Sequence, residues 1–103
     1  MARHLVLANL SGHDSHGVIR IPQYVGEMDR GELDPKGLPE VISEGPVTAL
    51  IDSHYGFGHV ACSFALAWCL EKARELGLAA AAVRHTNHIG RLGDYAERAA
   101  AEG

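Results

Sequence analysis

The chain has 103 residues, of which 47% are hydrophobic and 21% are charged, and its formal net charge is −4. This length allows one small globular domain but not two. The acidic balance argues against nucleic-acid and anionic-membrane binding, and the longest apolar stretch, residues 76–83, is too short for a membrane span. The N-terminus lacks a secretory signal pattern, and Cys62 and Cys69 are typical of reduced packing residues, so we expect a cytoplasmic protein.

The first third of the chain has helical patterns. Residues 3–10 predict the end of an amphipathic helix. A second helical stretch begins at Ser15 or near Pro22 and ends at Gly31. Proline and glycine over residues 34–39 then predict a loop.

Strand and helix patterns alternate in the rest of the chain. Strands over 40–43 and 47–52, joined by a Glu-Gly-Pro turn, predict a hairpin. The helix predicted over 60–76 is apolar on nearly all sides up to Glu71 and is expected to be buried. A buried strand is predicted over 78–83, although its four consecutive alanines would suit a helix equally well. A last helix is predicted over 91–102, and its expected inner face consists of Leu92, Tyr95, Ala96, Ala99 and Ala100.

This order of elements predicts a mixed α/β fold in one domain, residues 1–103. A helical part, residues 1–36, precedes a strand–helix–strand–helix unit over residues 37–103. No internal repeat and no linker divides the chain.

The first polar cluster is the segment Gly12-His13-Asp14-Ser15-His16-Gly17, which Arg20 follows. His16 and Arg20 are four residues apart, so one helical turn places both on the same face. A guanidinium binds a carboxylate through two parallel hydrogen bonds, and an imidazole can hold or protonate a neighbouring oxygen. The alternative is a solvated loop in which Asp14 and Ser15 cap a helix.

The second polar cluster is the segment His85-Thr86-Asn87-His88-Ile89-Gly90, directly after the predicted strand over 78–83. Ligands of open α/β sheets bind beyond the carboxyl ends of strands, which is where His88 falls. A histidine has a reference pKa of about 6.5, so it can move a proton near neutral pH. Asn87 or Thr86 would also cap the next helix, and that role is compatible with the first.

Two other interpretations of these polar residues have less support. His13, Asp14, His16 and His88 could ligate zinc or iron, but no second close ligand pair and no thiolate supports a metal. A hydrolase triad of Asp14, Ser15 and His16 fails because adjacent residues cannot align as nucleophile, base and orienting acid.

A glycine pattern further along the chain is a weak match to a dinucleotide fingerprint. Residues 56–61, Gly-Phe-Gly-His-Val-Ala, match Gly-x-Gly-x-x-Ala. Three residues separate this pattern from the predicted end of the preceding strand at Asp52, and Arg84 stands where an acidic ribose ligand is expected. We therefore do not predict a dinucleotide site there.

Taken together, the two polar clusters resemble the malate/L-lactate dehydrogenase family of non-Rossmann oxidoreductases. The resemblance covers nearly the whole chain, and the two clusters in this order are highly specific. The similar segments are residues 5–10, 12–18, Arg20, Pro22, Tyr24, 56–58, 71–74 and 87–96.

The resemblance implies an oxidoreductase that uses NAD or NADP to interconvert a 2-hydroxy acid and a 2-keto acid. His88 would be the acid/base that exchanges a proton with the substrate hydroxyl. His16 would also face the substrate and share proton donation, and Arg20, with Ser15 beside it, would bind the substrate carboxylate. No metal is expected. We expect His16 and His88 to meet around one pocket.

The family's members are longer than this chain. We therefore expect an N-terminal fragment, a single partial domain whose cofactor contacts lie mostly outside residues 1–103. The isolated chain is expected to lack dehydrogenase activity, to bind nicotinamide cofactor weakly or not at all, and to self-associate through exposed apolar surface. For the protein we expect a homo-oligomer, such as a homodimer. The alternative is a non-catalytic or metal-binding small domain that reuses the histidines.

Overall fold

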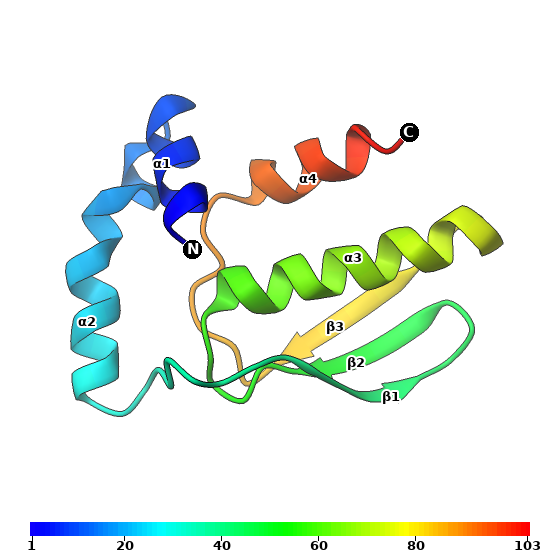
Figure 1. The fold of residues 1–103 in the computed structure, drawn as a ribbon, viewed down its shortest axis with the longest axis horizontal. Helices are drawn as coiled ribbons and strands as arrows, with labels where there is room; N and C mark the ends of the chain where they lie inside the picture. Colours follow the sequence, from blue (N-terminus) through cyan, green and yellow to red (C-terminus); the bar gives the residue numbers. More distant parts are fainter.

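The computed structural model, which describes residues 1–103, begins with a helical part (Figure 1). Helix α1 (Ala2–Leu10) is followed by two short 3-10 turns, η1 (Asp14–His16) and η2 (Val18–Arg20), and by helix α2 (Ile21–Asp29). Pro22 lies in the first turn of α2, where a backbone N–H would have no acceptor within the helix, so its absence costs no helical hydrogen bond. The second helix therefore begins near Pro22, as one of the two predicted starts requires.

Three strands form one sheet in the order β1-β2-β3. Strands β1 (Glu40–Glu44) and β2 (Thr48–Asp52) are antiparallel, which confirms the predicted hairpin. Strand β3 (Ala80–Arg84) is parallel to β2. A parallel neighbour requires a crossover, which helix α3 (Gly58–Leu76) provides. The predicted mixed α/β class is confirmed.

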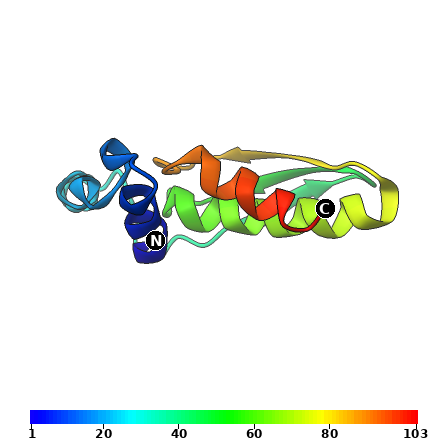
Figure 2. The same cartoon turned by 90° about the horizontal axis from the view of Figure 1, so that it is seen from above.

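Helix α3 covers the sheet, and helix α4 (Leu92–Ala100) lies beside α3 (Figures 1 and 2). Gly77 ends α3 in the left-handed conformation, with a φ of +87° that glycine adopts without strain. Cys62 and Cys69 of α3 are both free thiols and half-buried. No helix combines the length and the apolar character needed to cross a membrane.

The molecule is thin, with extents of 41 × 30 × 14 Å, so each element has one covered face (Figure 2). The predicted full burial of two elements is therefore wrong. Helix α3 begins at Gly58 and buries only residues near its N-terminal half, from Gly58 to Ala65. The strand predicted over 78–83 lies at Ala80–Arg84 and alternates between exposed and half-buried residues.

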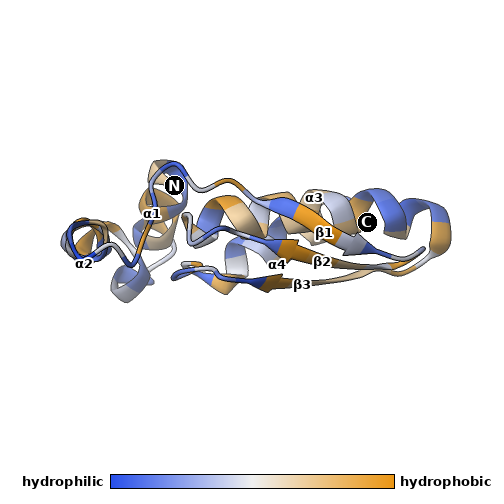
Figure 3. Ribbon diagram, turned by 90° about the horizontal axis from the view of Figure 1, so that it is seen from below, coloured by the Kyte–Doolittle hydropathy of each residue, from blue (hydrophilic) through white to orange (hydrophobic).

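Two small apolar clusters stabilise the two halves of the fold. Ala49 and Ile51 of β2 pack against Ala65 of α3, in the middle of the sheet, whose strands β2 and β3 are largely apolar (Figure 3). The second cluster joins α1 and α2 through Leu5 and Tyr24. This second cluster also contains Leu33 and is flanked by Met28 and Phe57.

The predicted inner face of the last helix is only partly right, because Tyr95 and Ala99 are half-buried whereas Leu92, Ala96 and Ala100 are exposed. Leu92 is 66% exposed, whereas the acidic residue Asp94 in the first turn of α4 is buried. The carboxylate of Asp94 lies 3.3 Å from His4 Nδ1 and 3.5 Å from Arg98 Nη1, so this buried carboxylate has polar partners from α1 and from its own helix.

Candidate active site

Asn9 of α1 holds the first polar cluster in place. Its side-chain nitrogen donates to Asp14 Oδ1 at 2.7 Å, and its side-chain oxygen accepts from the Val18 backbone N–H at 2.9 Å. A Cβ on Gly17 would overlap the Asn9 side chain, so a larger residue there would force Asn9 to move and break these bonds. These contacts fold the segment around His16 against the end of α1.

The structure brings the rings of His16 and His88 together, as expected, but neither of its two cavities is lined by these histidines, so the shared pocket is not found. Their ring centroids are 5.2 Å apart, although 72 residues separate them in the sequence. The His88 Nδ1 atom lies 2.9 Å from the Tyr24 hydroxyl, and no protein group bonds to Nε2. Ser15 Oγ lies 2.9 Å from His16 Nδ1. Both histidine rings are thus held at one nitrogen.

Arg20 lies in the 3-10 turn η2, directly before α2. Its Nε donates to the Ser15 backbone oxygen at 2.6 Å, and its Nη1 donates to Gln23 Oε1 at 2.6 Å. Gln23 in turn donates to Glu27 at 2.7 Å. The Nη2 edge of the guanidinium remains free, beside a cavity of about 250 Å³ that Ser15, Ile19, Arg20 and Gln23 line.

The environment lowers the pKa of both histidines. Partial burial lowers the pKa of His88 first, and the charges of Arg20 and His16 lower it further. For His16, burial again acts first, followed by the charges of His13 and Arg20. Both imidazoles are therefore mainly neutral at pH 7, and each can accept a proton.

The loop that contains His88 is fixed by close backbone contacts. The Asn87 side-chain nitrogen donates to the backbone oxygen of Tyr55 at 2.8 Å and also reaches those of Glu32 and Gly56. A Cβ on Gly58 would overlap the backbone of residues 87–88, so α3 begins directly against this loop.

His85 belongs to a different polar cluster, at the carboxyl ends of β2 and β3. The buried carboxylate of Asp52 accepts hydrogen bonds from the His54 backbone N–H and from Arg84 Nε, the latter at 2.8 Å. Its Oδ2 atom also lies 2.9 Å from His85 Nδ1. These bonds hold the pKa of Asp52 far below its ordinary range. His54 also contacts Glu40. This cluster joins the strand ends and lies apart from the His16–His88 pair.

A buried group of polar side chains lies between α1, α3 and α4. His4 and His59 form an edge-on ring pair with centroids 4.7 Å apart, and His4 contacts Asp94. Gly90 has a φ of +78° and a Cβ there would collide with both imidazoles, so only glycine lets the loop pass. His59 and Asp94 also line a cavity of about 280 Å³.

Comparison with known proteins assigns this arrangement to a family. The sequence profile described as malate/L-lactate dehydrogenase matches residues 1–103. This chain belongs to the malate/L-lactate dehydrogenase family. Relatives in the family include hydroxycarboxylate dehydrogenase B of Escherichia coli, which is 42% identical over 103 residues, and malate dehydrogenase of Pyrococcus abyssi, also 42% identical over 103 residues. These alignments cover 100% of this chain and 28% of each relative.

Solved structures of the same family share the fold. A putative malate/lactate dehydrogenase from E. coli matches with a TM-score of 0.94 at 40% identity, over 98% of this chain and 28% of that one. Malate dehydrogenase from Entamoeba histolytica matches with a TM-score of 0.92 at 34% identity, over the same shares of the two chains. The chain thus spans little more than a quarter of the length of these relatives.

A family of dehydrogenases implies a nicotinamide cofactor, but the Gly56-Phe57-Gly58 segment does not fit a dinucleotide. A Cβ on Gly56 would overlap the Gly37 carbonyl oxygen, and one on Gly58 would overlap those of Asn87 and His88. Carbonyl oxygens therefore occupy the space that a phosphate would need, and they repel anions. In addition, no group of three or more histidine, cysteine or acidic side chains is placed to hold a metal ion.

Sequence reasoning misses three residues that hold or adjoin the candidate site, namely Asn9, Tyr24 and His59. The pattern around Asn9 indicates only a helix, and His59 enters only as part of the glycine pattern. Tyr24 enters the resemblance without a role. Each is a polar side chain within an apolar helical segment, which is a signal for a buried partner, although the sequence does not identify that partner.

Proposed function

We propose that this chain supplies the substrate-binding and acid/base groups of a dehydrogenase that interconverts a 2-hydroxy acid and a 2-keto acid with NAD or NADP. The observation that supports it most is the pairing of His16 with His88 beside the Arg20 guanidinium. Membership of a dehydrogenase family gives the reaction class.

Arg20 would bind the substrate carboxylate. Two of its N–H groups are committed to Ser15 and Gln23, so the guanidinium has a fixed orientation while its Nη2 edge stays free. A planar guanidinium matches the two oxygens of a carboxylate. The adjacent cavity of about 250 Å³ has room for a small acid.

His88 would exchange the proton of the substrate hydroxyl at Nε2. Oxidation of a 2-hydroxy acid removes a proton from oxygen as the carbon loses a hydride, and a neutral imidazole can accept that proton. In the reverse direction the imidazolium returns it to the keto oxygen. His16, 5.2 Å away, would contact the same oxygen and share in proton donation.

A chimera tests this proposal, because the whole of this chain aligns with 28% of the length of E. coli hydroxycarboxylate dehydrogenase B. The matching segment of that enzyme is replaced by this chain, and turnover of malate, L-lactate and their keto acids is measured with NADH and NADPH. We expect His88→Gln to lower kcat by about 100-fold or more, and Arg20→Lys to raise KM roughly tenfold.

Two substitutions serve as matched controls. His85→Gln lies in the same loop but contacts Asp52, and Arg30→Lys alters an exposed arginine that pairs with Glu32. Both controls should leave kcat and KM within about twofold of the parent, as surface changes usually do. Full turnover by the His88→Gln chimera would contradict the proposal.

A further inference from the structure

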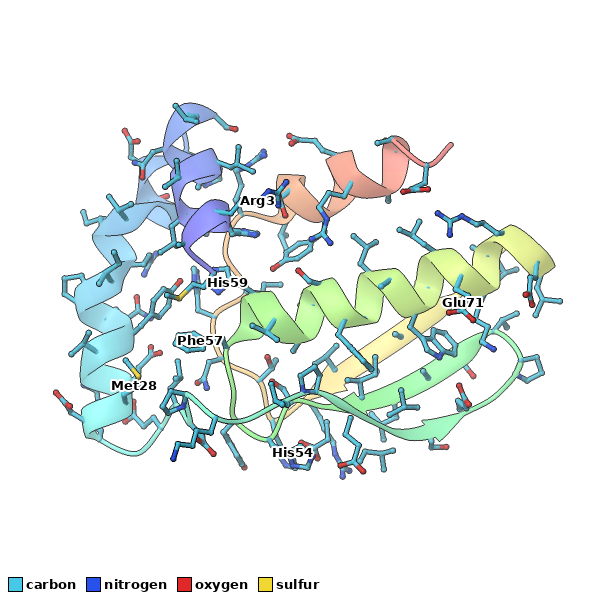
Figure 4. All side chains as sticks on the ribbon, viewed as in Figure 1. Arg3, Met28, His54, Phe57, His59 and Glu71 are labelled. Atoms are coloured by element: carbon cyan, nitrogen blue, oxygen red, sulfur yellow. The ribbon has the colours of Figure 1, made fainter.

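A buried tyrosine connects the candidate acid/base to a second histidine. The Tyr24 hydroxyl lies 2.9 Å from His88 Nδ1 and 3.4 Å from His59 Nε2, and Tyr24 and His59 are 2% and 3% exposed. His59 lies at the N-terminal end of α3, on the side that faces α1 and α2 (Figure 4). The three side chains form one line, His88–Tyr24–His59, from three separate elements.

This line has a direction, because the tyrosine hydroxyl has a single proton. If that proton points to His88 Nδ1, the neutral His88 ring must have its own proton on Nε2. If it points to His59 Nε2, the Tyr24 oxygen can accept a bond from His88 Nδ1–H. Only the second arrangement leaves a lone pair on His88 Nε2, where a substrate hydroxyl would give up its proton.

We propose that His59 is a positioning residue that accepts the Tyr24 hydroxyl proton and thereby keeps the proton of neutral His88 on Nδ1. This inference rests on the proposed acid/base role of His88. When the substrate proton arrives at Nε2, His88 becomes an imidazolium whose Nδ1–H still donates to Tyr24. The line therefore suits both protonation states of His88 without rearrangement.

His59 is suited to accept a hydrogen bond and unsuited to hold a charge. Burial, followed by the neighbouring charge of His4, lowers the pKa of His59 to about 4, so the ring is neutral at pH 7. When Nε2 accepts from Tyr24, the ring proton lies on Nδ1, which has no protein partner. His59 also borders the cavity of about 280 Å³, although its Nδ1 atom is itself buried.

The test measures ring protons directly in the full 103-residue chain. Long-range ¹H–¹⁵N correlation of ¹⁵N-histidine-labelled protein at about pH 8, above the reference histidine pKa, identifies which ring nitrogen is protonated. We expect neutral His88 to have its proton on Nδ1 in the wild type. In His59→Leu, where Tyr24 has no other acceptor, the proton of His88 should move to Nε2.

Two further variants separate the line from a general effect on packing. His59→Gln keeps an acceptor for Tyr24 and should retain the wild-type state of His88. Tyr24→Phe should itself change the His88 tautomer, and adding His59→Leu to it should then have no further effect on His88. Urea unfolding of each variant shows which of them fold.

Either of two results would overturn the inference: a proton on His88 Nε2 in the wild type, or an unchanged Nδ1 proton in a folded His59→Leu variant. If His59→Leu does not fold, the wild-type and Tyr24→Phe spectra still decide. The spectra are independent of turnover. An active His88→Gln chimera would therefore refute the proposed function alone and leave the hydrogen-bonded line intact.

Discussion

Substitution of Gly58 by alanine tests the contact that places His88. An added Cβ would overlap the carbonyl oxygens of Asn87 and His88 and would lie 2.8 Å from the His88 carbonyl carbon. Ordinary contact begins at 3.4 Å, so the loop must move by about 0.6 Å from that carbon alone. Backbone atoms cannot rotate away as a side chain can, so we expect the free energy of unfolding to fall by about 1–3 kcal/mol.

Gly26→Ala is the matched control, since it makes the same chemical change within helix α2. A Cβ there meets only the flexible end of Arg30, at 3.1 Å, so the free energy of unfolding should rise by about 0.5–1 kcal/mol from helix propensity. Urea unfolding monitored by circular dichroism and Trp68 fluorescence measures both variants. A Gly58→Ala variant as stable as the wild type would refute the close approach of α3 to residues 87–88.

Three further predictions concern charge and cofactor. The pKa of Asp52 is lowered in the fold, so its bonds stabilise the folded state above about pH 4 and this stabilisation is lost as the pH falls below it. The urea midpoint of Asp52→Asn should therefore be lower than that of the wild type at pH 7, and it should change less with pH between about pH 4 and 2. The pKa of His59 is about 4, so the wild type should lose about 3 kcal/mol of stability as pH falls from about 6.5 to 4, and His59→Gln should lose less. Calorimetric titration of NADH and NADPH into the chain should show no micromolar binding, because carbonyl oxygens fill the glycine segment.

The local signals in the sequence are sufficient for the order of elements but not for their burial. Pro22 and Gly77 mark helix ends through their own backbone chemistry, and the structure places helix ends at both. The burial of an element depends on how many layers of structure cover it, and a local sequence pattern does not predict that number. Leu92 is exposed, whereas Asp94 is buried. The carboxylate of Asp94 contacts His4 of α1 and Arg98 of the next turn of α4.

The candidate site also has features that the sequence predicts and features that only the fold determines. The spacing of His16 and Arg20 and the position of His88 after a strand are local features of the sequence, and the family resemblance links them into one site. The contacts of Asn9 and Tyr24 arise only when α1, α2 and the loop after β3 pack together. A polar side chain in an apolar helix signals that a partner exists, but only the fold identifies it.

The glycine pattern at residues 56–58 shows why a match to a motif needs its structural context. Glycine permits the close approach of another group, and the pattern alone does not state which group approaches. In a dinucleotide site that group is a phosphate, whereas here it is the backbone of the Gly37 and His88 loops. The same glycines thus bring the first turn of α3, with His59, against the loop that contains His88. Because both histidines contact Tyr24 across this junction, a small residue at position 58 is a geometric requirement of the hydrogen-bonded line.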